Sequence, residues 1–184
     1  MFAGHLGAGL ALKGRCHSVS LGVLFFAALL LDIALWALVL AGTESVHTPL
    51  DYRTAADLTY DFPYSHSLVA SLAWSVLAAA VCLLWWRRRP ARARAALVVA
   101  AAVFSHFVLD WLVHIPELPV LGNGSAKLGL GLWRHLTVAW CVEGAVAVVG
   151  LWLYLRTVAL APVKKASLMF VMALVMGLTI LGQA

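Results

Sequence analysis

The sequence predicts an all-α protein, a polytopic transmembrane helical bundle of about five spans preceded by a short N-terminal half-helix. Of its 184 residues, 64% are hydrophobic and 11% are charged. A soluble domain has about a quarter of its residues charged, so this composition indicates an integral membrane protein. The length suits a single membrane domain that covers residues 1–184.

Five apolar stretches are each long enough to cross a bilayer, which takes about 20 apolar residues. They cover residues 19–42, 67–86, 95–115, 130–155 and 165–183. The first follows two basic residues, as in a signal peptide, but it is too long for a signal peptide and is interpreted as a complete span. Residues 2–12 are too short to cross, so they form either a half-helix inside the bundle or a strip on the membrane surface.

Basic residues are shared unequally between the two sets of helix ends. One set holds Lys13, Arg15, Arg87, Arg88, Arg89, Arg92, Arg94, Arg156, Lys164 and Lys165, and the other holds Arg53, Lys127 and Arg134. The positive-inside rule then predicts an inner-membrane protein with a cytoplasmic N-terminal basic segment and with loops 43–66 and 116–131 outside. Because this asymmetry accounts for the net charge of +5, membrane lipids are the expected partners and nucleic acid is not.

The third apolar stretch contains three ionisable side chains at a spacing of four residues: His106, Asp110 and His114. On a helix these side chains lie on roughly one face. Ionisable groups at membrane depth are costly and usually mark a function. His106 and Asp110 lie deep in the span, whereas His114 lies near its outer end and could instead be an interfacial residue.

Other polar residues are expected at a similar depth. Asp32 interrupts the first span, so it should face the bundle, either in a functional site or in a hydrogen bond to a neighbouring helix. His66 opens the second span, or it is a surface histidine at the lipid boundary. If residues 2–12 form a half-helix, His5 reaches about mid-membrane, near Asp32 and His106.

The sequence therefore predicts one metal site whose ligands are His5, Asp32, His66, His106 and Asp110. Imidazole and carboxylate ligands without thiolate suit a divalent metal, with zinc expected and manganese or iron as alternatives. Asp32 or Asp110 could act as a general base instead of a ligand. His135 and Glu143, on the fourth span, could support the ligands or only bond helices together.

Three further expectations concern the helix ends. Ser65 is expected to cap the second span, and Pro116 is expected to end the third span just after His114. Trp133 is expected in the outer aromatic belt.

Four short motifs carry a family resemblance. In order along the chain they are Gly4-His5-Leu6, Leu31-Asp32-Ile33-Ala34, Ser65-His66-Ser67-Leu68 and Ser105-His106-Phe107-Val108-Leu109-Asp110. They resemble the Gly-His-Leu, Asp-Ile-Asp, Thr-His-Ser-Leu and Ser-His-x-x-x-Asp elements of the bacterial membrane-bound metal-dependent hydrolases, small inner-membrane proteins of largely uncharacterised activity. The resemblance covers residues 4–120 and implies a metal site and hydrolysis.

The chain departs from that family pattern in two places. Ala34 replaces the second aspartate of Asp-Ile-Asp, and Asp61-Phe62-Pro63-Tyr64 stands where the family has His-Arg-Gly. The loss of an acidic ligand and of an arginine leaves the number of metals open.

The expected function is that of a membrane-embedded metal-dependent hydrolase acting on an ester or phosphoester, and the depth of the site favours an amphiphilic or lipid-like substrate. One alternative is a non-enzymatic subunit that binds haem or contacts membrane-protein partners or further copies of itself. Another is a proton or metal-ion pathway, since chains of Asp and His can relay protons.

Overall fold

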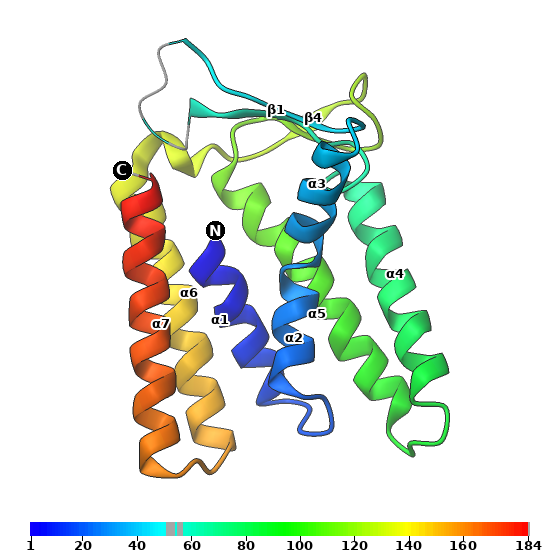
Figure 1. Ribbon diagram of the computed structural model, residues 1–184, viewed down its shortest axis with the longest axis vertical. Helices are drawn as coiled ribbons and strands as arrows, with labels where there is room; N and C mark the ends of the chain where they lie inside the picture. Colours follow the sequence, from blue (N-terminus) through cyan, green and yellow to red (C-terminus); the bar gives the residue numbers. More distant parts are fainter. Residues whose placement is uncertain (51–53, 55–56, 184) are drawn as a thin grey trace.

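The computed structural model describes residues 1–50, 54 and 57–183, and it shows a helical bundle capped at one end by short hairpins (Figure 1). The helices are α1 (Phe2–Lys13), α2 (Leu21–Ala28), α3 (Leu30–Leu40), α4 (Leu68–Trp85), α5 (Arg92–Val113), α6 (Leu136–Thr157) and α7 (Pro162–Gln183), with a 3-10 turn η2 (Leu132–His135) before α6. The prediction of an all-α bundle is confirmed.

Four helices are long and apolar enough to cross a membrane, namely α4, α5, α6 together with η2, and α7. The bent pair of α2 and α3 makes a fifth if it counts as one span. These helices confirm the predicted number of about five spans. The loops that join α1 to α2, α4 to α5 and α6 to α7 lie together at the end of the bundle opposite the hairpins (Figure 1).

The first span is not the single helix that the apolar run 19–42 predicts. The chain bends by 51° between α2 and α3, and Leu29 at the break has φ −104° and ψ 4°. Neither glycine nor proline marks this break, so the apolar pattern does not indicate it. The break places Asp32 in the first turn of α3 and frees carbonyl groups at the end of α2 from intrahelical bonds.

Helix α1 is the predicted half-helix, and it lies inside the bundle with its N-terminal end at mid-height (Figure 1). Ala3, His5 and Leu10 are fully buried, which excludes the alternative of a strip on the membrane surface. The helix packs mainly on α6, with α2 and α5 on its other side.

A glycine contact fixes the distance between α1 and α6. A Cβ atom on Gly150 would lie 2.0 Å from the carbonyl oxygen of Gly7, so no larger residue fits there without a shift of the helices. Small residues at such crossings are typical of membrane helices. Nearby, the Glu143 carboxylate accepts a hydrogen bond of 3.2 Å from the Gly4 amide, one of the first-turn amides that have no partner within the helix.

Two antiparallel hairpins cover the opposite end of the bundle. Strand β1 (Ser45–His47) pairs with β2 (Thr59–Asp61), and β3 (Leu118–Pro119) pairs with β4 (Lys127–Leu128). In the polar loop 43–66, residues 51–53 and 55–56 lie outside the described residues.

The ends of α4 and α5 decide two of the sequence expectations. Ser67, and not Ser65, caps α4, because its hydroxyl accepts a hydrogen bond of 3.1 Å from the Ala70 amide. Helix α5 ends at Val113 with His114 in an extended conformation, two residues before Pro116, as predicted.

Candidate metal centre

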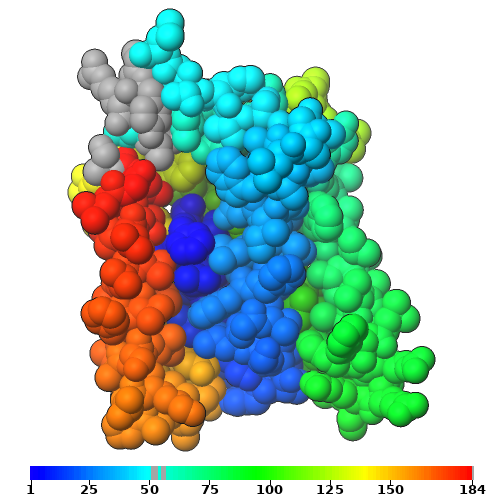
Figure 2. Space-filling view, viewed as in Figure 1, coloured from blue at the N-terminus to red at the C-terminus, as the bar shows by residue number. Residues whose placement is uncertain are grey.

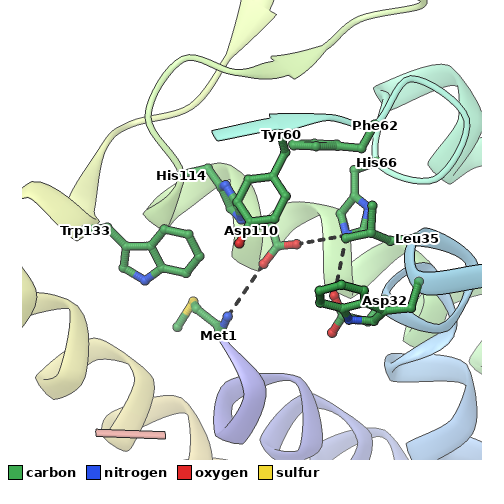
Figure 3. A pocket seen from close by; sticks show the side chains of 10 residues that line it. Met1, Asp32, Leu35, Tyr60, Phe62, His66, Asp110, His114 and Trp133 are labelled. Carbon is green, nitrogen blue, oxygen red and sulfur yellow. Dashed lines mark ion pairs between the residues drawn. The ribbon is translucent and has the colours of Figure 1, made fainter. Parts of the chain in front are cut away.

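The five predicted ligands converge at the hairpin end of the bundle, around the Asp110 carboxylate. Asp110 Oδ1 lies 3.2 Å from His5 Nε2, while Oδ2 lies 3.0 Å from His106 Nε2 and 3.5 Å from His66 Nε2. Asp32 Oδ1 lies 3.5 Å from His106 Nε2 and 3.7 Å from His66 Nε2. Figure 3 shows the side chains of Asp32, His66 and Asp110 turned toward one another. Asp32 comes from α3, His66 from the segment just before α4, and Asp110 from α5.

The broken helix fixes the orientation of His106. Its Nδ1 lies 2.7 Å from the carbonyl oxygen of Ala28, the last residue of α2. Because a carbonyl oxygen only accepts, Nδ1 carries the proton and donates it. In the neutral ring, Nε2 then presents a lone pair to the centre of the cluster. A carbonyl partner for the second ring nitrogen is typical of metal-binding histidines.

A chain of three residues fixes His66 in the same way. The Ser65 hydroxyl donates a 2.7 Å hydrogen bond to Glu44 Oε2, and Ser65 Oγ lies 2.8 Å from His66 Nδ1. Since the hydroxyl proton is already used, Ser65 must accept from Nδ1, and the lone pair of neutral His66 is on Nε2. Glu44 is itself held by the backbone amides of Tyr64 and Ser65, at 2.8 and 2.9 Å.

The two lone pairs therefore face one another, with His66 Nε2 and His106 Nε2 only 3.3 Å apart. Two acceptors cannot hydrogen-bond to each other, and the neighbouring oxygens of Asp32 and Asp110 are acceptors too. Neutral imidazoles with two ionised carboxylates have a net charge of −2, which one divalent cation balances. Zinc–nitrogen bonds of about 2.0–2.1 Å in a tetrahedron place ligand atoms about 3.3 Å apart, which matches this spacing.

The ligand atoms fall into two overlapping groups. His66, His106 and Asp110 form one, and His5, Asp32 and His106 form the other, with all atoms of each group within 4.8 Å of one another. His66, His106 and Asp110 are all buried, whereas the Asp32 side chain is 37% exposed. Three protein ligands with an open fourth position are the pattern of catalytic zinc sites. The donor set fits a divalent metal.

His5 is held differently from the other two histidines. Its ring stacks on His106 with 3.7 Å between ring centroids and an angle of 6° between the planes. Its Nδ1 is buried, and no described residue provides it with a hydrogen-bond partner. The position of His5 therefore depends on the packing of α1 against α6, at Gly7 and Gly150, rather than on a second hydrogen bond.

A cavity of about 100 Å³ lies over the cluster. Its lining includes Asp32, Trp36, His66, Asp110, His114 and Trp133, together with Met1, whose backbone nitrogen is 3.8 Å from Asp110 Oδ1 (Figure 3). The polar atoms of Asp32, His66 and Asp110 therefore adjoin a space that can hold water or part of a substrate.

His114 and Trp133 both line this cavity. His114 Nδ1 lies 2.6 Å from Glu117 Oε1, and the rings of His114 and Trp133 are 4.3 Å apart. His114 falls in neither group of metal-ligand atoms. The predicted place of Trp133 in an aromatic belt stays a prediction; in the structure its indole lines the cavity, with Nε1 buried and without a hydrogen-bond partner among the described residues.

The remaining candidates do not contribute ligands to the cluster. His135 is exposed at the end of η2, and Glu143 caps α1 as described. Ala34 is buried without a polar group, and Phe62 packs edge-on against the His66 ring at 5.0 Å.

Several functional contacts have no sequence signal. Glu44, Glu117 and the Ala28 carbonyl are brought to the histidines only by the fold, and nothing in the spacing of Glu44 and Ser65 indicates their hydrogen bond.

Comparisons of the chain with protein-family models, with curated proteins and with solved structures find no match.

Proposed function

We propose that this protein is a metal-dependent hydrolase of the membrane, with a divalent metal, zinc foremost, held by His66, His106 and Asp110. The observation that supports this most strongly is the 3.3 Å separation of His66 Nε2 and His106 Nε2, in two rings whose Nδ1 atoms are both hydrogen-bonded elsewhere. Asp32 and His5 flank these three residues, and the absence of a carboxylate at Ala34 favours one metal over two.

A zinc ion in this site would supply a Lewis acid that activates water at neutral pH. Asp32 is the better placed general base, because its side chain is partly exposed and adjoins the cavity. Asp110 is buried among three imidazoles and serves as a ligand. Water would transfer a proton to Asp32 while its oxygen forms a bond to the carbonyl carbon or the phosphorus. The bond from that atom to the alcohol oxygen would then break, and the alcohol oxygen would take the proton back from Asp32 as it leaves.

The resemblance to membrane-bound metal-dependent hydrolases supports the same proposal, since the chain keeps His5, Asp32, His66, His106 and Asp110 of those motifs. The excess of basic residues at the other end of the bundle would place the site toward the outer face of an inner membrane.

The two alternatives fit the geometry less well. Pockets for ligands of cofactor size occupy about 300–1,000 Å³, whereas this cavity has about 100 Å³. An ion pathway would need polar groups toward the basic end, but the core around α2 and α5 there contains Leu24, Val99, Ala102 and Val103.

Metal analysis of the purified protein tests the proposal. Protein prepared without added metal should contain about one divalent ion per chain, and His106→Ala and Asp110→Ala should each lose it. His135→Ala removes an exposed histidine outside the cluster and serves as the matched control. Full metal content in both cluster variants would contradict the proposal.

A panel of carboxylic and phosphoric esters then tests the chemistry. Wild-type turnover should disappear on chelation and return with zinc. Asp32→Asn should keep the metal and lose most of its turnover, because an amide cannot accept the proton. Turnover that survives both chelation and Asp32→Asn would exclude this mechanism.

A further inference from the structure

A second hollow lies beside the metal cavity, on the membrane-facing surface between α1 and α7. It has a volume of about 290 Å³ and is lined by Phe2, Val175, Leu178, Thr179, Gly182 and Gln183. The residues from α7 recur at intervals of three or four, so they form one face of the helix. Figure 2 shows the N-terminal part of α1 at the bottom of a gap between α7 and α3.

This hollow adjoins the metal cavity through consecutive residues. Met1 lines the cavity, and Phe2, which is 47% exposed, lines the hollow. On the other side of the gap Trp36 lines the cavity while its side chain is 56% exposed, so the cavity reaches the surface at α3. The metal cavity and the mainly apolar hollow thus border consecutive residues at the start of α1.

The depth of the hollow matches that of the site. From Val175 to Gln183, α7 rises about 12 Å, taking 1.5 Å per residue, and both the hollow and the ligands lie in the half of the bundle next to the hairpins. Half of a bilayer's hydrocarbon core is about 15 Å thick. In the proposed membrane placement, in which α7 crosses the bilayer as its length and composition allow, the side that borders the hollow would meet hydrocarbon chains.

The hollow is mainly apolar and the metal cavity is polar, as the hydrocarbon chain and the polar group of an amphiphile require. The hollow is lined mainly by apolar side chains, among them Phe2 and the 59% exposed Leu178, with Thr179 and Gln183 as its polar members. The cavity is lined by the Asp32 and Asp110 carboxylates and by the His66 and His114 imidazoles, with the Trp133 indole as part of its wall.

We infer that the substrate is an amphiphilic ester or phosphoester with at least one long hydrocarbon chain. It enters from the side, out of the bilayer, between α3 and α7. Its hydrocarbon chain lies in the hollow formed by Phe2 and α7, and its ester group lies in the metal cavity next to Trp133. This inference rests on the proposed hydrolase function and adds the class of substrate and its route to the site.

Photo-crosslinking tests the position of the chain without any need for turnover. The probe is a long-chain alkyl phosphonate, a non-hydrolysable analogue, with a diazirine in its chain, and it is added to the protein in lipid nanodiscs. Labelling should map to Phe2 and to residues 175–183, and an excess of unlabelled phosphonate should suppress it. Label spread evenly over the lipid-facing surfaces of α4, α6 and α7 would overturn the inference.

A pair of variants on α7 gives the second arm. Leu178→Trp fills the hollow, and Leu174→Trp adds the same bulk at an exposed position of α7 outside it. Leu178→Trp should reduce specific labelling and raise KM for a long-chain ester about tenfold, which corresponds to a loss of about 1.4 kcal/mol of binding free energy. It should leave KM for a short, water-soluble ester and the metal content unchanged, and Leu174→Trp should behave as wild type.

The outcomes separate the two proposals. A wild-type protein that binds metal but hydrolyses no ester would refute the proposed function, whereas the labelling map would still report whether a chain occupies the hollow. Active protein in which Leu178→Trp and Leu174→Trp affect long and short esters alike would refute the route through the hollow and leave the hydrolase intact.

Discussion

Removal of the Ser65 hydroxyl tests how the fold prepares His66 to bind metal. Ser65→Ala deletes the group that accepts from His66 Nδ1 and that donates to Glu44. The ring then loses the contact that keeps its lone pair on Nε2, and a buried Nδ1–H remains without a partner. We expect weaker metal binding in a protein that remains folded, because Glu44 still accepts from the amides of residues 64 and 65.

The size of the effect follows from these contacts. Loss of a group that supports a metal-binding histidine costs about 10–100-fold in affinity, which is about 1.4–2.7 kcal/mol. A buried N–H left without a partner costs about 1–3 kcal/mol, which is the same range. Competition with a chromophoric zinc chelator, on protein purified in detergent, measures the dissociation constant directly.

The neighbouring Ser67 provides the matched control. Ser67→Ala removes a hydroxyl of the same kind, but one that caps α4 and does not contact His66. It should reduce the free energy of unfolding by about 1 kcal/mol without changing the affinity of the folded protein for zinc. Equal zinc affinity in Ser65→Ala and Ser67→Ala would refute the role of the chain from Glu44 to His66.

Three further outcomes are expected. Gly150→Ala should lower both the melting temperature and the amount of bound metal, because its Cβ would meet the Gly7 carbonyl and move α1 together with His5. Gly144→Ala is the control, since its Cβ would meet only the end of Met176 at 3.7 Å, and it should change neither quantity. Thermal melts and metal analysis of both variants measure the two effects. His114→Ala should keep its zinc in elemental analysis, because the ring bonds Glu117 and belongs to neither ligand group; loss of zinc would make His114 a ligand. Bound zinc should fall as the pH is lowered, since protons compete for the imidazole lone pairs, and equilibrium dialysis over a pH series that gave constant binding would exclude histidine ligands.

The sequence alone determines the helices and the residues of the cluster. A length of about 20 apolar residues is needed to cross hydrocarbon, so the spans are visible as runs of apolar residues. Polar side chains within such runs are rare because they are costly, which is why Asp32, His106 and Asp110 could be selected without a structure. Their spacing on one helix also places His106 and Asp110 on one face.

The tertiary structure alone decides how those residues meet and which of their atoms are free. The break at Leu29 leaves no mark on apolar periodicity, because leucine and alanine suit a helix on either side of it. Yet that break turns the Ala28 carbonyl toward His106 and opens the gap next to Asp32. The packing of Gly7 on Gly150 brings His5 to Asp110, and Glu44 and Ser65 meet only because a hairpin folds over the end of the bundle. Hydrogen bonds between residues far apart in the chain have no period in the sequence, so the lone pairs at the centre of the cluster are a property of the fold.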